Sequence, residues 1–347
     1  MTGFGIVGCG HIAAKHAAAI QETEGAELKA VCDRNPERLK PFEKRGVSGY
    51  ITLGEMLADP NVDVVNICTP SGLHADMAIQ AACAGKHVVV EKPMALTLQD
   101  ADAMIEVCHE NGVLLTVVHP NRFRPAMQLL KQRVETGAFG KLGHVSATLR
   151  WNRNQAYFDQ DAWRGTCAMD GGVLMNQGIH QLDLLLWLLG EVEEVFSYEA
   201  TRIRSVESAD TSLSVMRFKS GLLGVVEAAV TVYPRNLEES LALFGESGTA
   251  VIKGRTANQI QTWQFADLSS EEEAQLIRKV RVDALGESGH RYLIQKVVKA
   301  LREGGRPPVT GYEGRNAVAL AIACQKAAET GRSVRLDSLI EKRGEIR

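Results

Sequence analysis

The first third of the chain alternates short apolar runs with segments in which apolar residues recur at helical spacing. Near-continuous runs of valine and isoleucine are typical of parallel strands that helices cover on both faces. Residues 1–122 are therefore expected to form a doubly wound parallel sheet of the α/β class. The pattern predicts a helix from about residue 11 to 23 and strands at residues 4–7, 28–31, 62–67, 87–90 and 113–118.

From about Leu142 onward, apolar and polar residues alternate within short segments that glycine-containing turns separate. This alternation is typical of antiparallel strands with one buried and one exposed face. Residues 123–347 are expected to form an α+β domain with one large, open, mostly antiparallel sheet. The last helical stretch, 315–330, could pack back on the first domain. Strands are predicted at residues 144–151, 195–204, 211–218, 222–233 and 240–244.

A broad open sheet with helices on only one face leaves its other face uncovered. A large exposed apolar surface is a liability in a monomer. We therefore expect a homodimer or homotetramer that assembles through the sheet of the second domain.

A glycine-rich turn links the first predicted strand to the first predicted helix. Gly8 permits a tight turn, Gly10 lets the backbone approach a pyrophosphate, and the small Ala13 allows close packing of helix on strand. Amide groups at the start of the helix, at His11 and Ile12, are available to anionic oxygens. The turn predicts a Rossmann dinucleotide-binding site, and the alternative is an ordinary turn between a strand and a helix.

An acidic residue ends the second predicted strand at the spacing that such a site requires. Asp33 lies 23 residues after Gly10, where a carboxylate can accept both hydroxyls of the adenosine ribose. Because this carboxylate would repel a 2′-phosphate, NAD is favoured over NADP. The neighbouring Arg34 could stack on the adenine or tolerate that phosphate.

The length, composition and charge of the chain indicate which classes of protein it can belong to. The chain has 347 residues, enough for two domains, of which 45% are hydrophobic and 23% charged. Its net charge is −3 and its pI is about 6.3, without a lysine and arginine cluster. These features argue against a nucleic-acid-binding protein.

The cysteines indicate a reducing compartment. Their number, seven, is odd, and no two of them form a Cys-x-x-Cys pair. We expect reduced thiols in a cytoplasmic protein, and no metal site. The longest apolar stretch, 182–189, contains Asp183 and is too short to span a bilayer, so no membrane segment is expected.

Polar residues follow three predicted parallel strands. The segments are 68–71, 91–93 and 119–122. Ligands bind such sheets beyond the carboxyl ends of the strands, so we expect these segments to border one crevice.

Several motifs together resemble one enzyme family. They are Cys68-Thr69-Pro70, Glu91-Lys92-Pro93 and the segment from Gly171 to His180, Gly-Gly-Val-Leu-Met-Asn-Gln-Gly-Ile-His. With a Rossmann domain and an open sheet domain, the whole chain resembles the glucose-fructose oxidoreductase/inositol dehydrogenase (Gfo/Idh/MocA) family. The resemblance implies an NAD(P)-dependent oxidoreductase acting on sugars, cyclitols or nucleotide sugars.

Lys92 is the first expected catalytic residue. Its amine could stabilise the alkoxide that forms as hydride leaves, or relay the proton. The alternative is an exposed lysine at a strand end. The resemblance places Thr69, Pro70 and His74 against the nicotinamide ribose, and Glu91 beside the cofactor with Lys92; helix capping is the alternative for the first three.

The second expected catalytic residue is His180. Asn176, His180 and Asp183 are spaced to share one face of a helix that Gly172 begins. A histidine beside the nicotinamide can remove a hydroxyl proton, although helix histidines are often structural. The family usually has aspartate where this chain has Asn176, which leaves Asn176 as a group that binds substrate hydroxyls.

The segment 151–164 is rich in groups that bind carbohydrate. Tyr157 and Trp163 can stack on sugar rings, and Arg164 can clamp a carboxylate or phosphate. The alternative is a solvated connection with structural tryptophans. Arg122 resembles a residue of the family's substrate-side loop.

The resemblance favours family members that oxidise UDP-N-acetylglucosamine-type sugars at C3. The substrate is then a sugar or nucleotide sugar. A myo-inositol-type cyclitol dehydrogenase is the alternative enzyme, and a non-catalytic NAD-binding regulator is the alternative of another class.

Overall fold

A computed structural model describes residues 1–280 and 288–340 of the chain. The backbone forms two compact units. The first contains Met1–Pro120 and Glu287–Arg315, and the second contains Asn121–Gly286 and Asn316–Arg347. Each unit is described separately.

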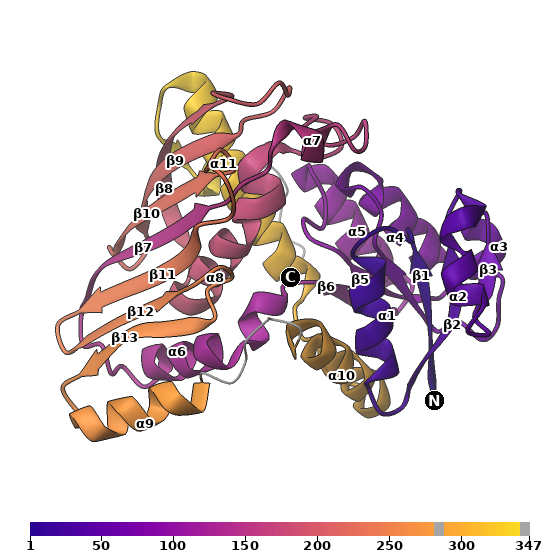
Figure 1. Cartoon of the computed structure of the whole chain (residues 1–347), viewed down its shortest axis with the longest axis horizontal. Helices are drawn as coiled ribbons and strands as arrows, with labels where there is room; N and C mark the ends of the chain where they lie inside the picture. Colours follow the sequence, from indigo (N-terminus) through magenta and orange to yellow (C-terminus); the bar gives the residue numbers. More distant parts are fainter. Residues whose placement is uncertain (281–287, 341–347) are drawn as a thin grey trace. The chain divides into compact units, whose positions relative to one another are not determined.

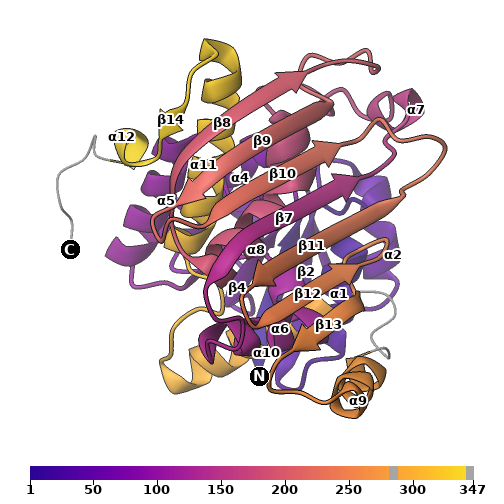
Figure 2. The ribbon, with the colours of Figure 1, turned by 90° about the vertical axis from the view of Figure 1, so that its left-hand side faces the viewer.

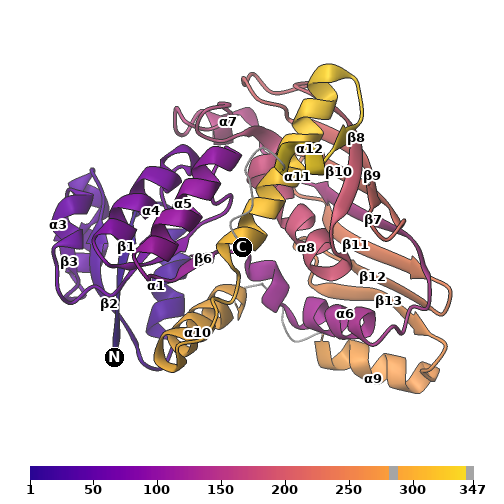
Figure 3. The same ribbon diagram turned by 180° about the vertical axis from the view of Figure 1, so that it is seen from behind.

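The first unit is built on a six-stranded parallel sheet with the strand order β3-β2-β1-β4-β5-β6. Helices cover both of its faces, α1 on one and α4 with α5 on the other (Figures 1 and 3). The strands are β1 (Thr2–Val7), β2 (Ala26–Cys32), β3 (Ser48–Tyr50), β4 (Val64–Ile67), β5 (His87–Val90) and β6 (Leu115–Val117). The helices are α1 (Ala13–Gln21), α2 (Lys40–Glu43), α3 (Leu53–Leu57), α4 (His74–Cys83), α5 (Leu98–Glu110) and α10 (Ser288–Glu303).

This sheet confirms the predicted doubly wound class. All residues of β4, and Val88, Val89 and Val90 of β5, are buried, as expected for strands that helices cover on both faces. The short edge strand β3 was not predicted, because its three residues carry no apolar run.

A helix from late in the sequence belongs to the first unit. Helix α10 packs against α1 and buries Leu293, Ile294 and Val297. The first turn of α11 (Gly311–Thr330) follows it, where Arg315 forms an ion pair with Asp102 of α5. The sequence analysis placed 123–347 in the second domain and allowed only the stretch 315–330 to pack back on the first. It did not single out α10, because apolar spacing shows that a helix has a buried face but not which domain buries it.

The second unit contains an eight-stranded sheet with the order β13-β12-β11-β7-β10-β9-β8-β14 (Figure 2). Every pairing is antiparallel except that of β7 with β10. The strands are β7 (Leu142–Arg150), β8 (Val192–Ala200), β9 (Thr211–Phe218), β10 (Leu223–Ala229), β11 (Glu238–Gly245), β12 (Gly248–Lys253), β13 (Gln259–Phe265) and β14 (Val334–Arg335). The other helices are α6 (Pro125–Glu135), α7 (Gln155–Phe158), α8 (Ile179–Leu189), α9 (Ser270–Val280) and α12 (Asp337–Ile340).

The two faces of this sheet differ in chemistry. Helices α6, α8 and α11 lie on one face, and none of the described helices of the unit lies in front of the other (Figures 1 and 2). Strand β9 shows the alternation, because Met216 and Phe218 are buried whereas Leu213 and Val215 are about half exposed. The open, mostly antiparallel sheet is thus confirmed, and its uncovered face carries apolar side chains: Tyr198, Leu213, Val215, Leu223 and Val225.

Within residues 1–280 and 288–340, no helix combines the length and the apolar character that crossing a membrane requires.

A half-buried carboxylate lies on the helix-covered side of the same sheet. Burial raises the pKa of Glu199 in β8 from 4.5 to about 7; a hydrogen bond with Ser212 opposes this rise, and the charge of Glu329 adds to it. Among the described residues, its Oε1 atom has no hydrogen-bond partner. An ionised carboxylate in this position destabilises the folded state.

We predict that Glu199→Gln stabilises the protein at pH 8 but not at pH 5. Because the folded pKa lies above the unfolded value, the wild-type protein loses stability as pH rises from about 4.5 to 7, whereas the variant does not. Thermal denaturation should show the melting temperature of the variant exceeding that of the wild type by a few degrees only at the higher pH. An equal difference at both pH values would contradict the prediction.

Candidate active site

The glycine-rich turn of the first unit has the geometry that a dinucleotide requires. Gly8 has φ +89°, and a Cβ atom there would lie 2.8 Å from the carbonyl group of Cys68, so only glycine fits. A Cβ atom on Gly10 would meet no atom within 4 Å, which leaves open space beside the backbone. Ile12 caps α1 without a side-chain hydrogen bond, so no cap side chain competes with a ligand for the first amide groups of the helix.

Asp33 joins the glycine turn to the end of β2. Its Oδ2 accepts the Cys9 N–H at 2.9 Å, and its Oδ1 accepts the Asn35 N–H at 2.9 Å. Each carboxylate oxygen retains a second lone pair that could accept a ribose hydroxyl. Arg34 is exposed, whereas Arg38, which the sequence analysis did not single out, lies 3.8 Å from Asp33 Oδ2.

Both ring nitrogens of His74 lie within hydrogen-bonding distance of backbone carbonyl oxygens. It is buried at 1% exposure, with Nδ1 2.8 Å from the Pro93 carbonyl oxygen and Nε2 3.0 Å from the Thr69 carbonyl oxygen. Burial lowers its pKa. The ring thus bridges the loop after β4, which holds Thr69 and Pro70, and the turn after β5.

Glu91 is likewise bonded to groups of the first unit. Its Oε1 lies 2.9 Å from His16 Nε2, and its Oε2 accepts the Lys92 N–H at 3.1 Å. Glu91 thus holds the turn that carries Lys92. Among the described residues, the group His16, Glu91 and His290 is the one whose atoms could together hold a metal ion.

In the second unit, the segment that contains Asn176 is not a regular α-helix. Residues Leu174–Gly178 form a π-helical turn, and α8 begins at Ile179. The wider turn changes the angular spacing, so the one-face arrangement of Asn176, His180 and Asp183 expected for an α-helix does not apply directly. The Asn176 amide donates to Asp170 of the preceding loop, and Asn176 and His180 are both half-buried.

Arg122 and Asp183 form a buried ion pair. The Arg122 Nε and Nη2 atoms lie 2.9 Å and 2.6 Å from the two Asp183 oxygens, and the side chains are 4% and 1% exposed. The guanidinium also lies over the Trp187 ring, 5.7 Å from its centre. This pairing links the start of the unit to α8.

The loop around α7 stacks arginines on aromatic rings. The Tyr157 ring lies 5.1 Å from the Arg153 guanidinium and 4.3 Å from that of Arg164. Arg164 also lies 4.7 Å from the Trp163 ring and forms an ion pair with Asp161 at 3.2 Å. Burial lowers the pKa of Arg153, a residue that the sequence analysis did not assign to the site.

This loop brings two guanidinium groups to one aromatic ring. Those of Arg153 and Arg164 both lie against the Tyr157 ring, and the Asp161 carboxylate pairs with Arg164. Guanidinium groups held flat against aromatic rings keep their N–H edges available to planar anions. The loop has the chemistry to bind a carboxylate or phosphate group together with a sugar ring or base.

Comparison with known proteins agrees with both units. Residues 2–119 match the oxidoreductase family with an NAD-binding Rossmann fold, and residues 127–251 match the GFO/IDH/MocA C-terminal domain. The chain is 33% identical to myo-inositol 2-dehydrogenase of Thermotoga maritima, over 97% of this chain and 99% of that one.

Two solved structures are similar over nearly the full length. One is the WlbA dehydrogenase of Bordetella pertussis in complex with NADH and UDP-GlcNAcA, with 39% identity, a TM-score of 0.91, and coverage of 96% and 97% of the two chains. The other is the WlbA dehydrogenase of Chromobacterium violaceum with the same two ligands, with 37% identity, a TM-score of 0.90, and coverage of 96% and 95%.

Four observations lead to one assignment: the glycine turn, the acidic residue after β2, the Glu91-Lys92-Pro93 motif and the matches across both units. This chain belongs to the Gfo/Idh/MocA family of NAD(P)-dependent oxidoreductases, dehydrogenases that act on the hydroxyl groups of sugars.

Proposed function

We propose that this enzyme oxidises a secondary ring hydroxyl, preferentially at C3, of an anionic nucleotide sugar of the UDP-N-acetylglucosaminuronate type. The observation that carries the proposal is the stack of Arg153, Tyr157 and Arg164. A neutral cyclitol needs no paired guanidinium groups in its site, whereas a uronate or a diphosphate can bind to them. The similarity to two dehydrogenases whose structures hold NADH and UDP-GlcNAcA supports the same substrate class.

The alternative enzyme is a cyclitol dehydrogenase. Its support is the 33% identity to myo-inositol 2-dehydrogenase over almost the whole chain. A cyclitol offers hydroxyls but no charge, so its binding would rely on groups such as Asn176 and His180 and not on the arginines.

The reaction removes one hydride and one proton from the CH–OH group and leaves a ketone. NAD, when bound, accepts the hydride at C4 of the nicotinamide. The Lys92 amine and the His180 imidazole are proposed to handle the proton, and Asn176 to bind a substrate hydroxyl. A positioned ammonium can stabilise the developing alkoxide, and an imidazole can remove the proton near neutral pH.

NAD is proposed as the preferred cofactor. Asp33 directly follows β2, and its Oδ2 atom is bonded to the Cys9 N–H of the glycine turn, where a negative charge disfavours a 2′-phosphate. Arg38 lies near this carboxylate and reduces the repulsion. We therefore propose a preference for NAD rather than an exclusion of NADP.

A homodimer or homotetramer is proposed on the uncovered face of the second sheet. Its exposed side chains include Tyr198, Leu213 and Val215, which lie across β8 and β9. Burial of such side chains against a second copy would remove apolar surface from water. A cytoplasmic location is proposed because all seven cysteines are free thiols.

The substrate class is tested by absorbance at 340 nm with NAD and a panel of UDP-N-acetylglucosaminuronate, UDP-N-acetylglucosamine, glucose and myo-inositol. We predict that the wild type forms NADH with UDP-N-acetylglucosaminuronate. In Arg164→Met, the KM for this compound should rise about 10-fold or more, because a charge-assisted contact is lost. NADH formation with myo-inositol alone would refute the proposal in favour of the cyclitol enzyme.

We also predict that Lys92→Ala keeps its affinity for NADH and loses kcat by about 10²- to 10⁴-fold, as expected when a group that acts on the reacting proton is removed. NADH binding is measured by fluorescence and turnover at 340 nm. Lys44→Ala, at an exposed position of the same unit, is the control and should match the wild type. Full turnover by Lys92→Ala would exclude the proposed role of this lysine.

A further inference from the structure

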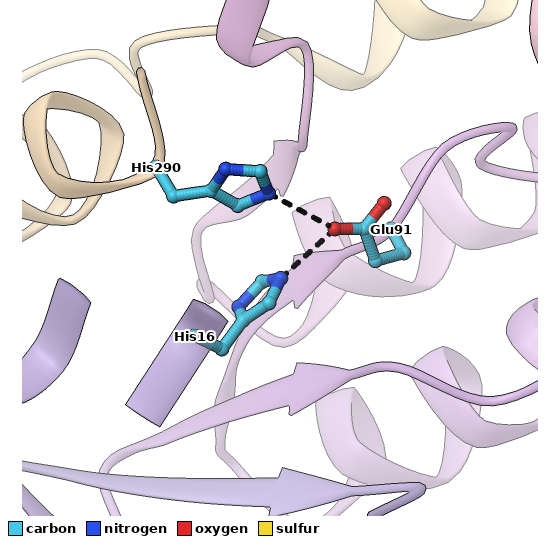
Figure 4. Close-up of side chains that lie close together, drawn as sticks. All are labelled: His16, Glu91 and His290. Atoms are coloured by element: carbon cyan, nitrogen blue, oxygen red, sulfur yellow. Dashed lines mark hydrogen bonds and ion pairs between the residues drawn. The ribbon is translucent and has the colours of Figure 1, made fainter. Parts of the chain in front are cut away.

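Two histidines and a glutamate from three distant parts of the sequence meet inside the first unit (Figure 4). His16 lies on α1, Glu91 follows β5, and His290 lies on α10. Glu91 Oε1 lies 2.9 Å from His16 Nε2 and 3.5 Å from His290 Nε2. All three residues are more than nine-tenths buried.

Both ring nitrogens of His16 have partners. Nδ1 lies 2.8 Å from the Asn66 side-chain amide, and Nε2 lies 2.9 Å from Glu91 Oε1. The three ligand atoms lie within 4.8 Å of one another, which a metal ion could also use. Hydrogen bonds account for this arrangement without a metal ion, and metal analysis of the purified protein distinguishes the two.

The Glu91 carboxylate uses both of its oxygens within this group. Burial by itself would raise its pKa, but hydrogen bonds from His16 and His290 outweigh burial and hold the pKa well below its usual range. The carboxylate is thus ionised, and its Oε2 accepts the backbone N–H of Lys92. An ionised buried carboxylate needs these donors, so the three elements that supply them are fixed relative to one another.

The turn that carries Lys92 is therefore held from two sides. Glu91 holds the Lys92 N–H, and His74 of α4 lies 2.8 Å from the carbonyl oxygen of Pro93. Glu91 acts on Lys92 through this backbone hydrogen bond. The group also includes α1, the helix that follows the dinucleotide turn.

We propose that Glu91, held by His16 and His290, is a positioning residue for Lys92, and that the docking of α10 on α1 thereby sets the geometry of the lysine amine. The inference rests on the proposed role of Lys92. It gives α10, although late in the sequence, a part in the chemistry of the first unit.

The test uses His290→Leu, His290→Gln and the control Arg291→Gln in the full chain. Leucine removes the donor to Glu91, glutamine supplies an amide N–H in its place, and Arg291→Gln breaks an exposed contact between α10 and Glu22, the residue that caps α1. NADH affinity, kcat and melting temperature are measured for each variant, with the panel compound that the wild type turns over.

We expect kcat to fall about 10- to 100-fold in His290→Leu, as expected when a reacting group is misplaced by a fraction of an ångström or more. His290→Gln should recover most of this loss, and Arg291→Gln should show none. NADH affinity should change by less than about 3-fold in all three, because the cofactor contacts remain. In the Lys92→Ala background, His290→Leu should have no further effect on the residual rate.

A second readout does not depend on turnover. The NMR titration of ¹³C-methylated Lys92, identified by its absence in Lys92→Arg, should shift in His290→Leu and not in Arg291→Gln. If the wild type turned over no compound of the panel but the Lys92 titration still shifted in His290→Leu, the proposed substrates would be rejected. The positioning role of Glu91 would then still be supported.

Three results would overturn the inference. The first is a folded His290→Leu variant with the kcat and the Lys92 titration of the wild type. The second is a fall of kcat in Arg291→Gln as large as that in His290→Leu, and the third is a further fall of the residual rate when His290→Leu is added to Lys92→Ala. One equivalent of metal in the purified protein, absent from His290→Leu, would instead make the three residues a metal site.

Discussion

The ionised carboxylate of Glu91, buried at the carboxyl end of β5, is the interaction on which the first unit most depends. A buried charge is stable only when donors surround it, and the donors come from α1, α10 and the Lys92 backbone. One side chain thus connects the dinucleotide turn, a helix from late in the chain and the lysine proposed to handle the proton.

The second unit also contains a buried charged side chain that is paired with a partner of opposite charge. Arg122 and Asp183 pair in the interior and orient α8, the helix that also carries His180. The π-helical turn before α8 directs Asn176 toward Asp170, so the candidate substrate-binding residues are set by this local geometry. The arginines of the α7 loop stay in a more open setting and keep edges available for an anion.

Several site residues were predictable because their chemistry depends on local sequence. Gly8 must adopt a positive φ immediately after a strand, and Asp33 must end the next strand, so spacing was sufficient for both. The partners of His74, Glu91 and Arg122 were not predicted, because most of them lie in other parts of the sequence. The sequence analysis did not identify His16 and His290 as partners of Glu91 for the same reason.

By itself, the sequence determined the two kinds of sheet, the dinucleotide turn and the position of Lys92 at a strand end, because hydrophobic period and glycine placement act over a few residues. Only the tertiary structure decided which buried polar groups pair with one another and that α10 belongs to the first unit. Such pairings depend on distances between segments up to about two hundred residues apart, as for Glu91 and His290, and no local pattern encodes those distances.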